Sequence, residues 1–249
     1  MPNPAPAAPL PAPLQVDYSE TKSVAARGKQ LPQLPVLPAV LDTARTYRIP
    51  LNLFDEFLAS MRMDLTVTDY PDRPALNRYM RGSAEVIGLQ MLPILGTVGP
   101  LRDAEPCAEA LGRAFQLTNF LRDINEDLDR NRVYLPADEL AAFGVDRELL
   151  FWCHDNHRTD SRVRQALAAQ HEVTRAIYRE AQKGIALLAP QSRPCVTAAF
   201  TLYSEILDRI EDIDYEVFSQ RASVGMGRRL QVFTGGLVRA RRARRMPAA

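Results

Sequence analysis

The sequence holds little that is typical of a secreted or membrane-spanning protein. It has three scattered cysteines (Cys107, Cys153 and Cys195), an odd set that predicts free thiols in a reducing compartment rather than a disulfide framework. No apolar run approaches the roughly 18 residues that span a bilayer. No basic stretch followed by an apolar one opens the sequence, as it would in a secretory signal. We therefore expect a cytoplasmic protein, with peripheral contact at the inner membrane face left open.

An excess of charge of one sign is also missing, and so are strand patterns. The 31 Lys and Arg residues nearly balance the 30 Asp and Glu residues, and the formal net charge is +1. This balance argues against strong global attraction to nucleic acid, and we expect none as a partner. The 46% of hydrophobic residues is ordinary for a globular protein. No alternating strand pattern of useful length and no internal repeat occurs, so the dense helical patterns predict an all-α protein.

Proline, in contrast, is concentrated at one end of the chain. Residues 1–38 hold nine of the 19 prolines, a composition that favours polyproline II and opposes a helix. We expect a disordered or loosely draped tail there, with binding to a proline-recognising domain as an alternative. A helical domain should cover residues 39–234, and an arginine-rich tail should cover 235–249.

Amphipathic helical patterns fill the predicted domain. They run over 39–47, 51–63, 75–95, 161–188 and 193–218, with a further helix that starts at an Asp103 N-cap and carries a group of aspartates, and short helices capped by Asp138 and Asp146.

The segment QLTNFLRDINEDLDRNRVYLP, residues 116–136, carries one polar stripe on an otherwise apolar helix. At helical spacing the stripe consists of Gln116, Asn119, Asp123 and the pair Glu126/Asp127. Two aspartates at i,i+4 repel each other in an isolated helix, and a cation between them reverses that effect. Because Mg²⁺ is usually held by one or two carboxylates plus substrate phosphates, the stripe predicts a diphosphate site. The alternative is a solvated helix end, in which Glu126 pairs with Arg130.

This stripe lies within a longer motif. LGRAFQLTNFLRDINEDLDRNRVYLPADEL closely resembles the second aspartate-rich signature of the squalene/phytoene synthase family, which reads L-G-x-x-x-Q-x-x-N-x-x-R-D-x-x-E-D and then R-x-Y-x-P. Residues 79–96 resemble the family's Y-x-x-x-x-A-G-x-x-G segment, with Tyr79, Ala84 and Gly88 matching and Glu85 in place of a small residue. That carboxylate either disturbs the local packing or finds an arginine partner. Residues 202–224 also resemble the family, and their DYEVFSQRASV part, residues 214–224, leans toward phytoene synthases. The resemblance runs over about 37–233.

The resemblance implies the isoprenoid synthase helical bundle, with a cavity between its helices. It also implies head-to-head condensation of two geranylgeranyl diphosphates to phytoene through a cyclopropyl diphosphate, with release of diphosphate. A squalene- or dehydrosqualene-type synthase that uses farnesyl diphosphate is the near alternative. Mg²⁺ is the expected cofactor, with Mn²⁺ as the other candidate ion, and no redox cofactor is expected.

The resemblance also implies a role for each matching residue. Asp123 and Asp127 would bind the metal with support from Glu126, and Tyr79 joins the two aspartates as a catalytic residue. Contact with the diphosphate or shaping of its site would come from Gln116, Asn119, Arg122, Arg132 and Tyr134. Leu89, Met91 and Leu92 are candidates for lining the tunnel, and plain core is their alternative role.

One expected element is not found in the sequence. The family carries a first aspartate-rich motif, D-x-x-x-D, which faces the second from an early helix. The proline-rich tail holds only Asp17 and Glu20 as acids, and neither these nor Asp42 and the pair Asp55/Glu56 match the motif. We therefore expect a bundle that lacks its N-terminal part and half of its metal site. A non-catalytic member or fragment is the competing interpretation.

Two further patterns remain outside this motif. Cys153, His154 and His157 form C-H-x-x-H, but a structural zinc site needs a fourth ligand that the sequence does not offer, so we expect a helix surface there, and His171 should be exposed. The segment RARRARRM, residues 239–246, predicts an electrostatic patch. Docking on an anionic membrane is its expected function, with a solvated chain end or nucleic-acid binding as alternatives.

Overall fold

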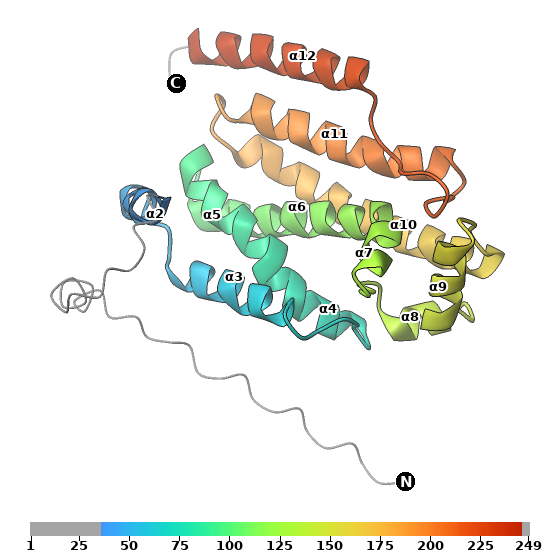
Figure 1. The fold of residues 1–249 in the computed structure, drawn as a ribbon. Coiled ribbons are helices and arrows are strands. Elements are labelled where there is room, and N and C mark those ends of the chain that lie inside the picture. Colours follow the sequence, from blue (N-terminus) through green and yellow to red (C-terminus); the bar gives the residue numbers. More distant parts are fainter. Residues whose placement is uncertain (1–35, 246–249) are drawn as a thin grey trace, which may run out of the picture.

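The computed structural model describes residues 36–245, and within that range the chain is helical with no β-strand beyond isolated bridges (Figure 1). The elements are α2 (Val36–Thr46), α3 (Asn52–Met63), α4 (Arg73–Met80), the π-helical turn η1 (Arg81–Glu85), α5 (Val86–Leu95), α6 (Leu101–Arg122), α7 (Ile124–Asp129), α8 (Ala137–Ala141), α9 (Arg147–Asp155), α10 (Ser161–Lys183), the 3₁₀ turn η2 (Gly184–Leu187), α11 (Arg193–Asp212) and α12 (Met226–Arg245). The all-α prediction is confirmed.

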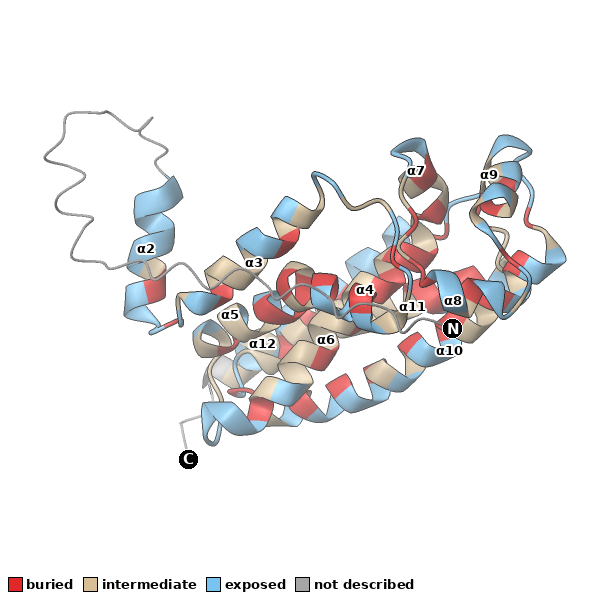
Figure 2. Ribbon diagram, turned by 90° about the horizontal axis from the view of Figure 1, so that it is seen from below, coloured by how far each residue is buried: buried red, intermediate tan, exposed pale blue. Residues whose placement is uncertain are grey.

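Helix α6 lies at the centre of this arrangement. It packs along α10 and also against α5, η1 and α11, while α12 lies chiefly on α11 (Figure 1). The main hydrophobic core follows from these contacts, with Leu76, Leu121, Leu150 and Phe218 among its fully buried side chains. Figure 2 shows buried residues along the inner helices and a largely exposed α2, in which only Ala44 is buried.

Two glycines of the signature segments let the backbone of α6 contact the backbones of η1 and α5 directly. A Cβ atom at Gly112 would lie 2.4 Å from the carbonyl oxygen of Ala84, and one at Gly88 would lie 2.3 Å from that of Ala108. Real Cβ atoms do not approach a backbone oxygen so closely, so any side chain at either position would push the helices apart. The family signatures therefore encode a close helix crossing beside the site.

The unusual carboxylate of the 79–96 segment has found arginine partners. Glu85 is buried, and its Oε1 atom lies 2.7 Å from Nε of Arg113 on α6. Arg81 approaches the other carboxylate oxygen at 3.5 Å. A buried carboxylate needs such pairing, so Glu85 ties η1 to α6 instead of disturbing the packing.

Several helices begin or end at other residues than the sequence patterns predict. Most of the predicted 1–38 tail lies outside the described residues, but α2 already begins at Val36, because a proline such as Pro38 is tolerated in the first turn of a helix. The predicted boundary at 235 falls inside α12, which runs unbroken to Arg245. Asp103 lies in the first turn of α6 rather than at its N-cap, whereas Asp146 does cap α9, accepting a 2.8 Å bond from the Leu149 amide.

Candidate functional site

The predicted polar stripe is not one continuous helix, because α6 ends where its first aspartate begins. Asp123 has φ −102° and ψ 11°, outside the helical region, and α7 starts at Ile124. The break at Asp123 separates the part of the stripe before it from Glu126 and Asp127, which follow it. Gln116 and Asn119 therefore lie on α6, and Glu126 and Asp127 lie on the separate turn α7.

Two guanidinium groups hold the carboxylate of Asp123. Arg122 donates from Nε to Oδ1 at 2.7 Å, and Arg221, in the segment between α11 and α12, donates from Nη2 to the same oxygen at 2.8 Å. Arg221 also lies 3.1 Å from Oε1 of Glu126. Partial burial raises the pKa of Asp123, but the bonds from Arg122 and Arg221 outweigh it and hold the pKa below its ordinary value.

The second aspartate has the opposite environment. Burial, and then the negative charge of Asp123, raise the pKa of Asp127 to about 6, and Arg130 and Arg132 offset only part of this. Its nearest ion-pair partner is Nη1 of Arg130 at 3.6 Å. One turn before the break, Oδ1 of Asn119 is buried and makes no hydrogen bond. A partly buried carboxylate and an unpaired amide oxygen are the hard oxygen donors that suit a divalent cation, so these residues fit Mg²⁺.

Glu126 is placed differently from the two aspartates. Its side chain is half-exposed, and its carboxylate pairs with Arg221. In the described part of the chain, no three His, Cys, Asp or Glu residues come together as a ready metal site. The assignment of Glu126 as a supporting metal ligand therefore stays a prediction. The same holds for metal binding by Asp123 and Asp127.

The predicted tyrosines lie in an aromatic cluster beside the aspartates. Tyr134 stacks on Phe120 of α6 with 4.2 Å between the ring centroids. The ring centroid of Tyr79 lies 5.6 Å from that of Tyr134. Burial, reinforced by Tyr134 and Asp64, raises the pKa of Tyr79 far above its ordinary value. Its phenol is therefore a neutral hydrogen-bond donor at every working pH.

Arg132 connects this cluster to the aspartate side. Its guanidinium donates to the Tyr134 hydroxyl at 3.1 Å and to the Asp64 carbonyl at 2.6 Å, and Nη1 lies 3.6 Å from the Asp64 carboxylate. The same guanidinium lowers the pKa of Asp127. Arg132 thus lies between the two groups, and its contact with phosphate stays a prediction.

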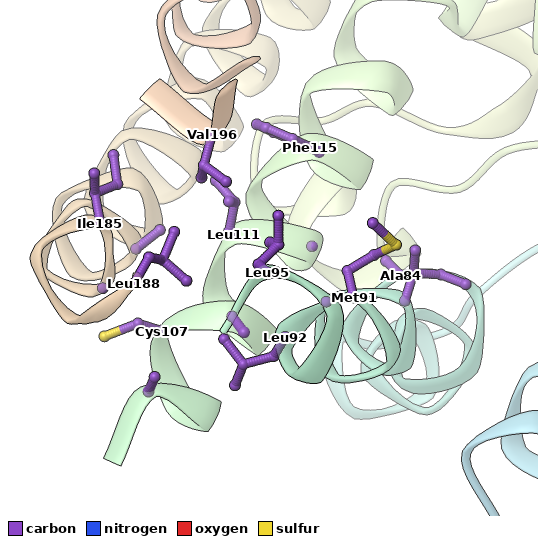
Figure 3. Close-up of a pocket in the computed structure, with 17 residues that line it drawn as sticks. Ala84, Met91, Leu92, Leu95, Cys107, Leu111, Phe115, Ile185, Leu188 and Val196 are labelled. Atoms are coloured by element: carbon purple, nitrogen blue, oxygen red, sulfur yellow. The ribbon is translucent and has the colours of Figure 1, made fainter. Parts of the chain in front are cut away.

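An apolar cavity begins on the preceding turns of α6. Figure 3 shows its walls, which come from η1, α5, α6, the end of α10, η2 and α11. The larger side chains around it are those of Ile87, Met91, Leu92, Leu95, Leu111, Phe115, Ile185, Leu188 and Val196. Phe115 directly precedes Gln116, so α6 supplies first a cavity wall and then the polar residues. The arrangement can hold an apolar chain with a charged head near the aspartates.

The tunnel prediction was right for two residues and wrong for the third. Met91 and Leu92 line the cavity. Leu89 lies on another side of α5 and packs in a separate small cluster with Ala44, Ile49 and Leu53.

Sequence reasoning missed Arg221 and Asp64. Arg221 is 98 residues from Asp123 in sequence, so only the phytoene-synthase-like stretch around it, residues 214–224, could have drawn attention to it. Asp64 ends α3 and carries no motif of its own.

The histidines take structural positions. His154 bonds to Oδ1 of Asn125 at 2.7 Å and lies 3.4 Å from Asp129, so it connects α9 to α7. Cys153 is buried and accepts a bond from the Asp160 amide. The prediction that His171 is exposed was wrong, because the face of α10 that carries it turns inward and its Nε2 lies 3.0 Å from the Leu207 carbonyl.

Comparisons with known proteins agree with this architecture. The sequence profile of the family described as squalene/phytoene synthase matches residues 12–228. The chain is 38% identical to phytoene synthase of Arthrospira platensis over 219 residues, which cover 83% of this chain and 69% of that one. It is 37% identical to the chloroplastic phytoene synthase of Daucus carota, of which it spans 48%.

Solved structures add the fold. A dehydrosqualene synthase in complex with ligand superposes with a TM-score of 0.74 at 24% identity, covering 90% of this chain and 77% of that one. Squalene synthase HpnC from Alicyclobacillus acidocaldarius gives 0.66 at 24% identity, covering 73% and 66%. The helices described above therefore form an isoprenoid synthase fold, and the chain belongs to the squalene/phytoene synthase family.

Proposed function

We propose that this chain is a phytoene-synthase-type prenyltransferase, which joins two geranylgeranyl diphosphates head to head through a cyclopropyl diphosphate and releases diphosphate. One observation carries the proposal: α6 supplies the wall of an apolar cavity and, directly after it, a group of carboxylates and guanidiniums. A prenyl diphosphate has the matching chemistry, a long apolar chain with a multiply charged head. The identity to phytoene synthases, at 37–39% over most of the chain, favours the longer substrate over farnesyl diphosphate.

The carboxylates and the arginines of the site would have different roles. Asp127 and Asn119 would hold Mg²⁺, together with Asp123, and the ion would neutralise the negative charge that develops on the leaving diphosphate. Arg122 and Arg221 now compensate Asp123, and their N–H groups are positioned to bind diphosphate oxygens when a metal takes over the carboxylate. Arg132 would add positive charge from the tyrosine side.

The cavity and Tyr79 would protect the reactive intermediate. Carbocations need surroundings without water or strong nucleophiles, and the cavity walls are aliphatic and aromatic. The buried, neutral phenol of Tyr79 can direct a hydrogen bond toward an anionic group without being a phenolate that would react with the cation.

The second candidate is binding of prenyl diphosphate without turnover. It is favoured by the fact that residues 36–245 bring no three potential acidic, cysteine or histidine ligands together, while Asp123 is already neutralised by two arginines. Such a chain would need a further set of carboxylates to complete the metal site.

Product formation separates the two candidates. Purified protein is incubated with Mg²⁺ and geranylgeranyl diphosphate, and phytoene is measured by liquid chromatography. Turnover predicts phytoene that disappears in Asp127→Asn and persists in Asp138→Asn, an exposed aspartate away from the stripe. Folded protein that binds the substrate but forms neither phytoene nor the cyclopropyl diphosphate would leave only the binding candidate.

A further inference from the structure

Helix α12 has two faces of different character. Its inner side lies on α11, where Val232 is buried and Gly236 packs against Ala198 and the carbonyl of Pro194. Its outer side carries four apolar side chains that recur every three or four residues, and these define the outer stripe of α12. They are Met226, Leu230, Phe233 and Leu237, with exposed fractions of 76, 61, 64 and 42%.

Positive charge surrounds this outer stripe. At helical spacing, Arg229 lies on one side of the four residues and Arg241 lies on the other, and both are exposed. Arg239 and Arg242 add charge in the last turns. The chain contains no acidic residue after Glu216, so α12 itself offers nothing to neutralise them. Among the α12 arginines whose side chains the structure describes, Arg228 alone forms an ion pair with the body of the protein, with Nε 2.9 Å from Oε1 of Glu205 on α11.

We propose that the outer stripe of α12 is a docking surface for an anionic lipid membrane. A helix with an apolar stripe flanked by arginines lies in the plane of the lipid headgroups, with its apolar side chains buried at the acyl boundary and its cations at the phosphates. Charge complementarity selects this occupant, because a second copy of the chain would bring the same arginines against themselves. Nucleic acid would use the charge but not the four exposed apolar side chains.

The position of α12 gives the docking a consequence for the cavity. A Cβ atom at Gly236 would lie 3.6 Å from Cβ of Ala198 and from the carbonyl oxygen of Pro194, so α12 packs on the stretch of α11 that also carries Val196, a residue that lines the apolar cavity. Docking through α12 therefore leaves a single helix between the membrane and α11, which carries this wall residue of the cavity.

Vesicle flotation tests the proposal without substrate, so its outcome is independent of catalytic activity. The probes are vesicles of equal parts phosphatidylglycerol and phosphatidylcholine, and vesicles of phosphatidylcholine alone. We expect the wild-type chain to float with the anionic vesicles only, and to dissociate as salt is raised toward 1 M. We expect Leu230→Gln/Phe233→Gln to lower the partition coefficient at least about tenfold, because two apolar side chains no longer enter the bilayer.

Charge is tested in a matched pair of variants. Arg229→Gln/Arg241→Gln should weaken binding about fivefold for each arginine removed. Arg78→Gln/Arg102→Gln removes the same charge from exposed positions on α4 and α6 and should bind like the wild type. Val173→Gln removes an exposed apolar side chain from α10, outside the outer stripe of α12, and should also bind like the wild type. Thermal unfolding monitored by circular dichroism verifies that each variant is folded.

Three results would overturn the proposal. The first is equal binding to both vesicle types, or to neither. The second is a dimer in analytical ultracentrifugation that Leu230→Gln/Phe233→Gln dissociates while vesicle binding is unchanged, which would make the stripe an interface between copies. The third is binding to double-stranded DNA that outcompetes vesicles and does not depend on Leu230 or Phe233.

Discussion

At the scale of single residues, the site is defined by two aspartates four positions apart with opposite environments. Asp123 receives hydrogen bonds from two guanidiniums, whereas Asp127 is partly buried with its nearest arginine at 3.6 Å. The sequence predicted that both carboxylates share one face. It could not predict the difference, because Arg221 reaches Asp123 from a distant part of the chain.

Removing Arg221 should weaken the binding of diphosphate. Its guanidinium is half-exposed, so solvent screens it, and we expect Arg221→Gln to lower the affinity for inorganic diphosphate plus Mg²⁺ about fivefold, corresponding to about 1 kcal/mol. Isothermal titration calorimetry gives the affinity. Arg209→Gln, an exposed arginine that pairs with Asp212, is the matched control. An unchanged affinity in Arg221→Gln would assign this residue a purely structural role.

Asp127 should make stability depend on pH in an unusual direction. Its pKa is raised to about 6 in the folded chain, so the folded state binds more protons than the unfolded state between about pH 4 and pH 6. The free energy of unfolding therefore falls as the pH rises through this window. Asp127→Asn removes the effect and should stabilise the metal-free protein above pH 6, by on the order of 2 kcal/mol.

Urea unfolding at pH 4.5 and pH 7.5, in the presence of a chelator, measures this effect. The advantage of Asp127→Asn over the wild type should be clearly larger at pH 7.5 than at pH 4.5, and Asp138→Asn should show no such change. A variant that is less stable than the wild type at pH 7.5 would mean that Asp127 is already well paired in the folded chain.

At the scale of the elements, helical periodicity predicted most helices but not the points where they break. The predicted 75–95 helix is α4, the π-helical turn η1 and α5, and the aspartate helix breaks at Asp123. Periodicity records which residues are apolar, and it contains no information on a local change of backbone geometry. The wrong prediction that Leu89 lines the tunnel has the same origin. Periodicity shows that the position is apolar, but it does not show which neighbouring helix the side chain contacts.

The close crossing of η1 and α6 gives a prediction at this scale. Gly112→Ala places a Cβ atom 2.4 Å from a backbone oxygen of Ala84, which cannot rotate away. We expect a loss of about 2–4 kcal/mol, or roughly 5–15 °C in Tm for a chain of this size. Gly99→Ala is the control, because a Cβ atom there meets nothing within 4 Å.

Thermal unfolding by circular dichroism compares the two variants. The Gly99 variant should unfold within about 0.5 kcal/mol of the wild type, because it only restricts the unfolded chain. Equal unfolding temperatures for Gly112→Ala and the wild type would contradict the idea that this glycine sets the distance between the helices.

At the scale of the whole molecule, the sequence predicted the all-α bundle, the family and the side of α6 that carries the aspartates. It did not predict where the cavity lies relative to them, because the lining residues come from elements as far apart in sequence as η1 and α11. Nor did it predict that α12 continues to Arg245, because the arginine-rich composition after residue 235 was interpreted as a tail. Among residues 36–245 no helix is both long and apolar enough to cross a bilayer.

The central claim is that α6 and α7 bind a prenyl diphosphate through Mg²⁺. Calorimetric titration with a non-hydrolysable geranylgeranyl thiodiphosphate, with and without Mg²⁺, tests it most directly. We predict binding that requires Mg²⁺, weakens at least about tenfold in Asp127→Asn, and strengthens as the pH rises through about 6, where Asp127 loses its proton. Binding of equal strength without Mg²⁺, or binding that Asp127→Asn leaves unchanged, would contradict the account.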